Sequence, residues 1–216
     1  MSYSCAIFDS SDRGKEVEVS GEDSSIRDEL YEGQVRKMKH AMDKAKILPG
    51  HRILDIGCGW GSLAIMIAES IPSTKIDAIT LSVHQQTLAQ ERIALAGLSD
   101  RITVHLMDYR EMPSDWENAF DRVISIEMVE HVGKDFLEAF WSALHWAMKP
   151  KDAVGVVQCI TMPEASRSRF PHQSFLSARI VSQGAMDKSL ISCGSGSVII
   201  FSRISRFLFT AQQSKK

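Results

Sequence analysis

The chain has 216 residues, of which 44% are hydrophobic and 24% are charged, and its formal net charge is −2. This length and composition indicate one globular domain with a sizeable core and argue against a disordered or fibrous protein. The near-neutral charge argues against nucleic acid as a partner, because binding through phosphates needs a clustered basic surface.

A helix is predicted over residues 24–46, since apolar residues recur there near helical spacing until Pro49-Gly50. From residue 52 onward, short apolar runs alternate with amphipathic ones. The predicted strands are Arg52–Ile56, Lys75–Leu81, Ile102–Met107, Phe120–Ile126 and Ala153–Ile160, and the predicted helices between them are Ser62–Ser70, Val83–Ala96 and Lys134–Met148. This alternation predicts an α/β fold, a doubly wound and mostly parallel sheet of the Rossmann-like type.

The composition changes after Pro163, where serine becomes frequent and acidic residues nearly vanish. We therefore interpret residues 1–163 as the core and residues 164–216 as a divergent, serine-rich tail that forms an edge hairpin or is disordered. Two short runs in the tail, Ser197–Ser202 and Arg206–Thr210, are the candidate hairpin strands. If they do not pair with the sheet, the fifth strand leaves an exposed edge.

The four cysteines, Cys5, Cys58, Cys159 and Cys193, are widely spaced and form no CxxC pair. They predict neither a disulfide framework nor a metal site, and a reducing, cytoplasmic setting is the default interpretation. No apolar run approaches the roughly 20 residues that span a bilayer, and the first residues lack the pattern of a secretory signal.

A glycine-rich loop, Leu54-Asp55-Ile56-Gly57-Cys58-Gly59-Trp60-Gly61, joins the first predicted strand to a helix. Glycines let a backbone turn sharply and approach a ligand closely, and ligands of such sheets bind beyond the carboxyl ends of the strands. A dinucleotide site would require glycine where Ser62 stands. The Asp55 carboxylate suits a ligand with an ammonium and a sulfonium better than a pyrophosphate. The loop therefore predicts S-adenosylmethionine; a dinucleotide site and a purely structural turn are the alternatives.

Loops at the same edge of the sheet supply further candidates for the cofactor site. Thr80 and Gln85 are placed to hydrogen-bond a ribose, and Asp108 is placed to accept the adenine amino group while Tyr109 packs on the ring. Each of these residues has a simpler alternative role as a helix cap or a loop hydrogen bond.

Together these residues resemble the cyclopropane-fatty-acyl-phospholipid synthase family, which includes the mycolic acid cyclopropane synthases. The matching segments are Tyr3-Ser4-Cys5-Ala6, the glycine loop, Thr80-Leu81-Ser82, residues 120–133 with Ile126-Glu127-Met128-Val129-Glu130-His131, and Gln158-Cys159-Ile160-Thr161. Many methyltransferases share the glycine loop, whereas its combination with Tyr-Ser-Cys-Ala and Ile-Glu-Met-Val-Glu-His is far more specific.

The resemblance implies lipid biosynthesis, in which the methyl carbon of S-adenosylmethionine is added to a cis double bond of an unsaturated phospholipid and closes a cyclopropane ring. It implies that Tyr3, Ser4, the stretch from Ile53 to Gly61, the stretch from Thr80 through Leu81 to Gln85, and Tyr109-Arg110 line the cofactor site. It further implies that Cys5, Glu130 and the backbone at Ile160 hold a bicarbonate ion that serves as base. Gln158 stands where many members carry histidine; glutamine can donate to an anion but cannot titrate.

These residue types suit the implied chemistry. Methyl transfer to an alkene develops a carbocation, which Glu130 can stabilise in an apolar pocket, and Glu127 lies near enough in the sequence to serve the same region. Cys5 has no adjacent histidine or lysine to lower its thiol pKa, so it is not expected to be a nucleophile.

Two other functions remain as alternatives: an N-methyltransferase for a small amine, and a chain that binds the cofactor without turnover. The family carries further strands and a tyrosine after the fifth strand, whereas no tyrosine follows Tyr109 here. A phospholipid substrate would require transient contact with a membrane surface, at least.

Overall fold

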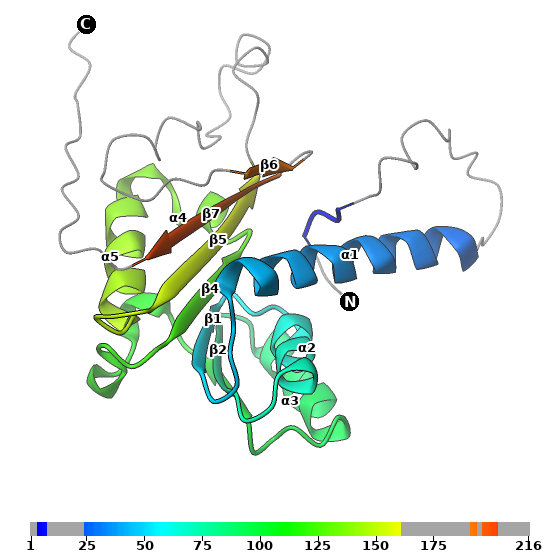
Figure 1. The fold of residues 1–216 in the computed structure, drawn as a ribbon, viewed down its shortest axis with the longest axis horizontal. Coiled ribbons are helices and arrows are strands. Elements are labelled where there is room, and N and C mark those ends of the chain that lie inside the picture. Colours follow the sequence, from blue (N-terminus) through cyan, green and yellow to red (C-terminus); the bar gives the residue numbers. More distant parts are fainter. Residues whose placement is uncertain (1–3, 8–23, 161–190, 194–195, 203–216) are drawn as a thin grey trace, which may run out of the picture.

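A computed structural model describes residues 4–7, 24–160, 191–193 and 196–202, and among these it describes the side chains of residues 4–7 and 29–159. Within these residues seven strands form one sheet in the order β3-β2-β1-β4-β5-β7-β6 (Figure 1). The strands are β1 (Arg52–Ile56), β2 (Lys75–Thr80), β3 (Ile102–Leu106), β4 (Arg122–Ile126), β5 (Val154–Ile160), β6 (Ile191–Cys193) and β7 (Gly196–Ser202).

Helices cover both faces of the sheet. Their bounds are α1 (Ser24–Ala45), α2 (Ser62–Ser70), α3 (Val83–Leu95), α4 (Val129–Val132) and α5 (Leu137–Ala147), with short 3₁₀ turns η2 (Tyr109–Glu111), η3 (Ser114–Trp116) and η4 (Lys134–Phe136). Buried side chains of α1, α2 and α3 form one apolar cluster with the sheet, and those of α4 and α5 form another on the opposite face (Figure 1). The predicted doubly wound fold is confirmed. No helix in the described ranges is long and apolar enough to cross a membrane.

The sheet is parallel from β3 to β5, and its last two strands turn back. Strand β7 pairs antiparallel with β5 from Val154↔Ser202 to Ile160↔Gly196, and β6 pairs antiparallel with β7. The run Ser197–Ser202 is therefore a strand against the sheet, as the sequence pattern indicated. Its described hairpin partner is Ile191–Cys193, which comes before it, while Arg206–Thr210 lies outside the described residues.

Two predicted elements begin later in the structure than in the sequence pattern. Strand β4 starts at Arg122, because Phe120 forms only an isolated bridge with Met148. The predicted helix from Lys134 starts with the turn η4 and becomes α-helical at Leu137.

A buried arginine ties the end of α1 to the start of β4. The Arg122 side chain donates from Nη1 to the carbonyls of Asp121 (2.6 Å) and Asp152 (2.9 Å), and from Nη2 to the carbonyl of Lys46 (2.9 Å). Burial lowers its pKa, and the charges of Asp121 and Asp152 partly offset that effect. These bonds hold three chain reversals together at the edge of the sheet opposite the carboxyl ends of its parallel strands.

We predict that Arg122→Met destabilises the protein, because it removes the buried side chain that donates to these three carbonyls. The free energy of unfolding should fall by about 2–4 kcal/mol. Urea denaturation would measure this loss, with Lys151→Met as the control because Lys151 is an exposed cation on the same turn. A loss no greater than that of the control would contradict the assignment.

Candidate cofactor and active site

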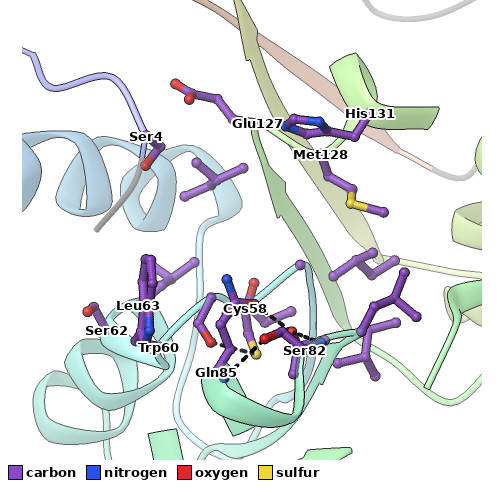
Figure 2. A pocket seen from close by; sticks show the side chains of 18 of the residues that line it. Ser4, Cys58, Trp60, Ser62, Leu63, Ser82, Gln85, Glu127, Met128 and His131 are labelled. Atoms are coloured by element: carbon purple, nitrogen blue, oxygen red, sulfur yellow. Dashed lines mark hydrogen bonds between the residues drawn. The ribbon is translucent and has the colours of Figure 1, made fainter. Parts of the chain in front are cut away.

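A cavity of about 410 Å³ opens at the carboxyl ends of β1, β2 and β4. The strand order reverses between β1 and β4, and ligands of open α/β sheets bind at such a reversal. Figure 2 shows glycine-loop and α3 residues on one side and residues following β4 on the other. The lining residues are Ser4, Lys37, Met38, Asp55, Ile56, Gly57, Cys58, Gly59, Trp60, Ser62, Leu63, Ile79, Thr80, Leu81, Ser82, Gln85, Met107, Tyr109, Ile126, Glu127, Met128 and His131.

The glycine loop is fixed to neighbouring elements on two sides. The amides of Gly57 and Cys58 both donate to the carbonyl of Ile79 at the end of β2, over 3.0 and 3.1 Å. Arg92 of α3 donates to the carbonyl of Trp60 over 2.7 Å. Gly61, with a φ of 76°, is the residue that caps α2. The loop therefore keeps one shape, and its backbone borders the cavity.

Asp55 places a carboxyl group at the bottom of the cavity. It is 2% exposed, and its Oδ2 has no hydrogen-bond partner among the described residues. Burial raises its pKa from 3.8 to about 7. A cation bound beside Asp55 would favour the ionised form and give the buried carboxylate a partner.

The far end of the cavity carries the residues expected at the ribose and adenine. Thr80 donates to the side-chain oxygen of Gln85 over 2.7 Å, so the two act as one polar pair. Tyr109 lines the cavity and packs edge-on against Phe140, with ring centroids 5.4 Å apart. Asp108 is not among the lining residues; Arg110 binds its carboxylate at 2.9 and 2.6 Å and lowers its pKa. Its role toward adenine stays a prediction.

Residues 4–7 lie against α1 and close one side of the cavity. The amide of Ile7 donates to the carbonyl of Gly33 over 3.1 Å, and Arg36 returns a bond to the carbonyl of Ile7 over 2.8 Å. A Cβ atom on Gly33 would lie 2.9 Å from the Cβ of Ala6, so only glycine allows this approach. Ser4 is brought to the cavity by this packing.

Lys37 is a buried cation at this wall that the sequence pattern did not single out. It is 4% exposed, and its Nζ contacts the hydroxyl of Ser4 and the side-chain oxygen of Gln34, the latter at 2.6 Å. Burial lowers its pKa, while the charge of Glu127 acts in the opposite direction. A polar pair spaced three residues apart on the apolar face of a predicted helix was the signal available in the sequence.

Glu127 joins the amino-terminal segment to the end of the sheet. Its Oε1 accepts from the backbone amide of Cys5 over 2.9 Å and from Nε2 of Gln158 over 3.1 Å. Its own amide donates to the carbonyl of Gln158 over 2.8 Å. Burial first, and then the charge of Glu127, raise the pKa of the Cys5 thiol, which fits the expectation that Cys5 is not a nucleophile.

The structure brings most of the predicted cofactor residues into one cavity. Ser4, Asp55, Gly57, Cys58, Gly59, Trp60, Thr80, Leu81, Gln85 and Tyr109 all line it. Gly61 is not among the lining residues; it caps α2 at the end of the loop. Tyr3 lies outside the described residues. The residues implied at a bicarbonate ion, Cys5, Glu130, Gln158 and the backbone at Ile160, do not line it, although Glu127 connects Cys5 to Gln158 beside it. Glu127 and Lys37 also line the cavity, although neither was predicted to belong to the cofactor site.

Fold and site together define the class I S-adenosylmethionine-dependent methyltransferases. The chain belongs to the mycolic acid cyclopropane synthetase family, whose model matches residues 1–193. It is 36% identical over 163 residues to the tuberculostearic acid methyltransferase of Mycobacterium tuberculosis, a match that covers 76% of this chain and 35% of that protein. It is 34% identical over 151 residues to the cyclopropane-fatty-acyl-phospholipid synthase of Escherichia coli, which covers 70% and 33%.

Solved structures agree with this assignment. A mycolic acid cyclopropane synthase in complex with S-adenosylhomocysteine and CTAB superposes with a TM-score of 0.62 at 26% identity, covering 81% of this chain and 53% of that one. A geranyl diphosphate C-methyltransferase from Streptomyces coelicolor superposes with a TM-score of 0.74 at 16% identity, covering 94% and 92%, and so supports the fold alone. The chain spans about a third of the length of the curated relatives named above.

The loop geometry predicts that alanine destabilises the protein more at Gly61 than at Gly50, although both glycines have a left-handed backbone. Gly61→Ala would place a Cβ 3.2 Å from the Cβ of Ala89, whereas Gly50→Ala, also at positive φ, meets no atom of the described ranges within 4 Å. Both changes cost about 1 kcal/mol in backbone strain, and the Gly61 change should cost roughly 1 kcal/mol more through overpacking. Thermal unfolding of the two variants measures the difference, and equal losses would contradict the packing of the loop on α3.

Proposed function

We propose that this chain is an S-adenosylmethionine-dependent C-methyltransferase in lipid biosynthesis, which adds a methylene group to cis double bonds of unsaturated phospholipid acyl chains. Family membership and the names of the relatives support the lipid substrate. The proposal includes transient contact with a membrane surface. An acyl chain must leave its bilayer to reach a cavity at the carboxyl ends of the strands.

The observation that carries the cofactor assignment is the buried Asp55 carboxyl beside a glycine backbone, with one oxygen that has no partner in the described part of the chain. At Gly59 a Cβ atom would meet no atom of the described residues within 4 Å, and this open space leaves room for a ligand. Asp55 would face the positive groups of S-adenosylmethionine, Thr80 and Gln85 its ribose, and Tyr109 its adenine. The cofactor supplies a methyl group on a sulfonium.

The chain's own residues would shape the rest of the reaction. Met38, Leu63 and Met128 give the cavity apolar walls, which exclude water and suit an acyl chain. Glu127 presents a carboxylate near this apolar region, where a carbocation formed from the alkene would be stabilised electrostatically. The low dielectric of such a site makes that effect larger than in water.

The bicarbonate that the resemblance implied is a poor match to the residues as they stand. The amide of Cys5 and the Gln158 side chain, two of the donors that would hold it, already bind Glu127. A second anion there would meet the negative charge of that carboxylate. No step is therefore routed through bicarbonate.

The test is incubation of the full chain with methyl-labelled S-adenosylmethionine and dioleoyl phosphatidylcholine vesicles, with a parallel set of small secondary amines. Label in the phospholipid, with a mass gain of one methylene, supports the proposal. Label only in amines would favour an N-methyltransferase. Cofactor binding by calorimetry without label in any acceptor would identify a chain that binds and does not turn over, and either of these last two results overturns the proposal.

Cofactor affinity should depend on pH through Asp55. Because a cation binds the ionised carboxylate and the pKa of Asp55 is about 7, affinity should rise roughly tenfold between pH 6 and pH 8. Asp55→Asn should bind S-adenosylmethionine more weakly at pH 8 and should lack this rise in affinity. Any pH dependence that the variant retains would come from titration of the cofactor itself. Calorimetric titrations at both pH values provide the comparison, and parallel profiles for the two proteins would refute the role of Asp55.

The same carboxyl should act on stability with the opposite sign. A raised pKa in the folded state favours the protonated form, so the cofactor-free protein loses stability as the pH rises from about 4 through about 7. Asp55→Asn removes this loss. Without cofactor at pH 8, the variant should therefore unfold at a higher temperature than the wild type.

A further inference from the structure

Glu127 has a backbone conformation that glycine adopts more readily than any other residue. Its φ is 51°, in the left-handed region, directly after the last residue of β4. A non-glycine residue in this region raises the energy of the backbone, and such residues concentrate at functional sites. The position therefore carries its side chain at a cost in backbone energy, so the contacts of that side chain are of interest.

The side chain binds two of the donors that the resemblance implied for a bicarbonate ion. Figure 2 shows it extending from the end of β4 toward the segment that carries Ser4. Its Oε1 accepts from the Cys5 amide at 2.9 Å and from Gln158 Nε2 at 3.1 Å, and Oε2 takes part in neither bond. These two donors belong to the amino-terminal segment and to β5, so the carboxylate is fixed between two parts of the fold. The residue also lines the cavity.

The charges around this carboxylate disfavour the binding of another anion. The negative charges of both Glu127 and Glu130 act on the thiols of Cys5 and Cys159, so the two carboxylates lie in one neighbourhood. Lys37 is the cation that interacts with Glu127 from α1. With one carboxylate already on these two donors, a free carbonate-type anion would add like charge beside Glu127 and Glu130.

We propose that the Glu127 carboxylate occupies the anion position itself and is the general base of the proposed reaction. This inference rests on the proposed function. After a methyl group has been added to one alkene carbon, the neighbouring carbon is a cation. A carboxylate oxygen of Glu127 takes a proton from the added methyl group, and the electron pair of that C–H bond forms the third C–C bond of the ring. The proton then leaves the carboxylic acid to solvent, and the base is regenerated.

Three variants test this role. Glu127→Gln keeps the size of the side chain and an acceptor for the Cys5 amide but cannot accept the proton. Glu127→Gly removes the carboxylate and suits the left-handed backbone, which offsets part of the stability lost with its two hydrogen bonds. Glu91→Gln, an exposed change on α3, is the matched control. Each is assayed for lipid product in buffer freed of dissolved carbon dioxide and again with about 10 mM bicarbonate added. This concentration is on the order of the Kd expected for a weakly bound small anion.

The wild type and the control should turn over equally with and without bicarbonate. Glu127→Gln should lose at least about 100-fold in turnover, the usual contribution of a general base, while its affinity for S-adenosylmethionine changes less than about threefold. Glu127→Gly should be similarly slow without bicarbonate and recover at least about tenfold when it is added, because an external base can then occupy the vacated donors.

A second measurement does not depend on turnover. Line broadening of ¹³C-bicarbonate should be absent with the wild type and present with Glu127→Gly. Wild-type activity that disappears without bicarbonate, or a Glu127→Gln variant as active as the control, overturns the base role. If no protein forms lipid product, the proposed function fails and the base role fails with it. The ¹³C measurement then decides separately whether Glu127 occupies the anion position, and binding by the wild type would refute that part too.

Discussion

Strand β1 is hydrogen-bonded on both sides, to β2 and to β4, and most of the site follows from that constraint. The chain that leaves a strand so enclosed must turn away from the sheet, and the amides of Gly57 and Cys58 secure that turn on the carbonyl of Ile79. The same pairing sets Asp55 opposite Ala78 and Ile124, which buries its carboxyl at the floor of the cavity. Loop shape and charge placement thus have one origin.

Much of this arrangement could be predicted from the sequence, because it depends on local patterns. The apolar periodicity located the strands from Arg52 to Ile160 and the helices between them, and the sign of the charge at Asp55 indicated the kind of ligand. Strand β6 was missed because three residues, Ile191–Cys193, are too few to show a period. The pairing of Asp108 with Arg110 competes with its expected contact to adenine, and spacing alone did not weigh that competition.

The residues that sequence reasoning missed or undervalued depend on contacts between distant parts of the chain. Cys5 and Glu127 are 122 positions apart and meet only because residues 4–7 pack on α1. The spacing places Lys37 on the apolar face of a helix, but its burial depends on the packing of residues 4–7, which the helix pattern does not show. The backbone angle at Glu127 has no signature in an alternating strand pattern. Tertiary placement, more than residue type, determined which polar groups face the cavity.

The left-handed backbone at Glu127 has an implication for how this protein would respond to selection. Glycine there would relax the main chain, but it would also leave the Cys5 amide and the Gln158 side chain without the acceptor that Glu127 supplies. A search for heat-resistant variants would therefore set the backbone strain against two hydrogen bonds that join distant parts of the chain. Replacement by glycine in such a search would show that the strain outweighs those bonds.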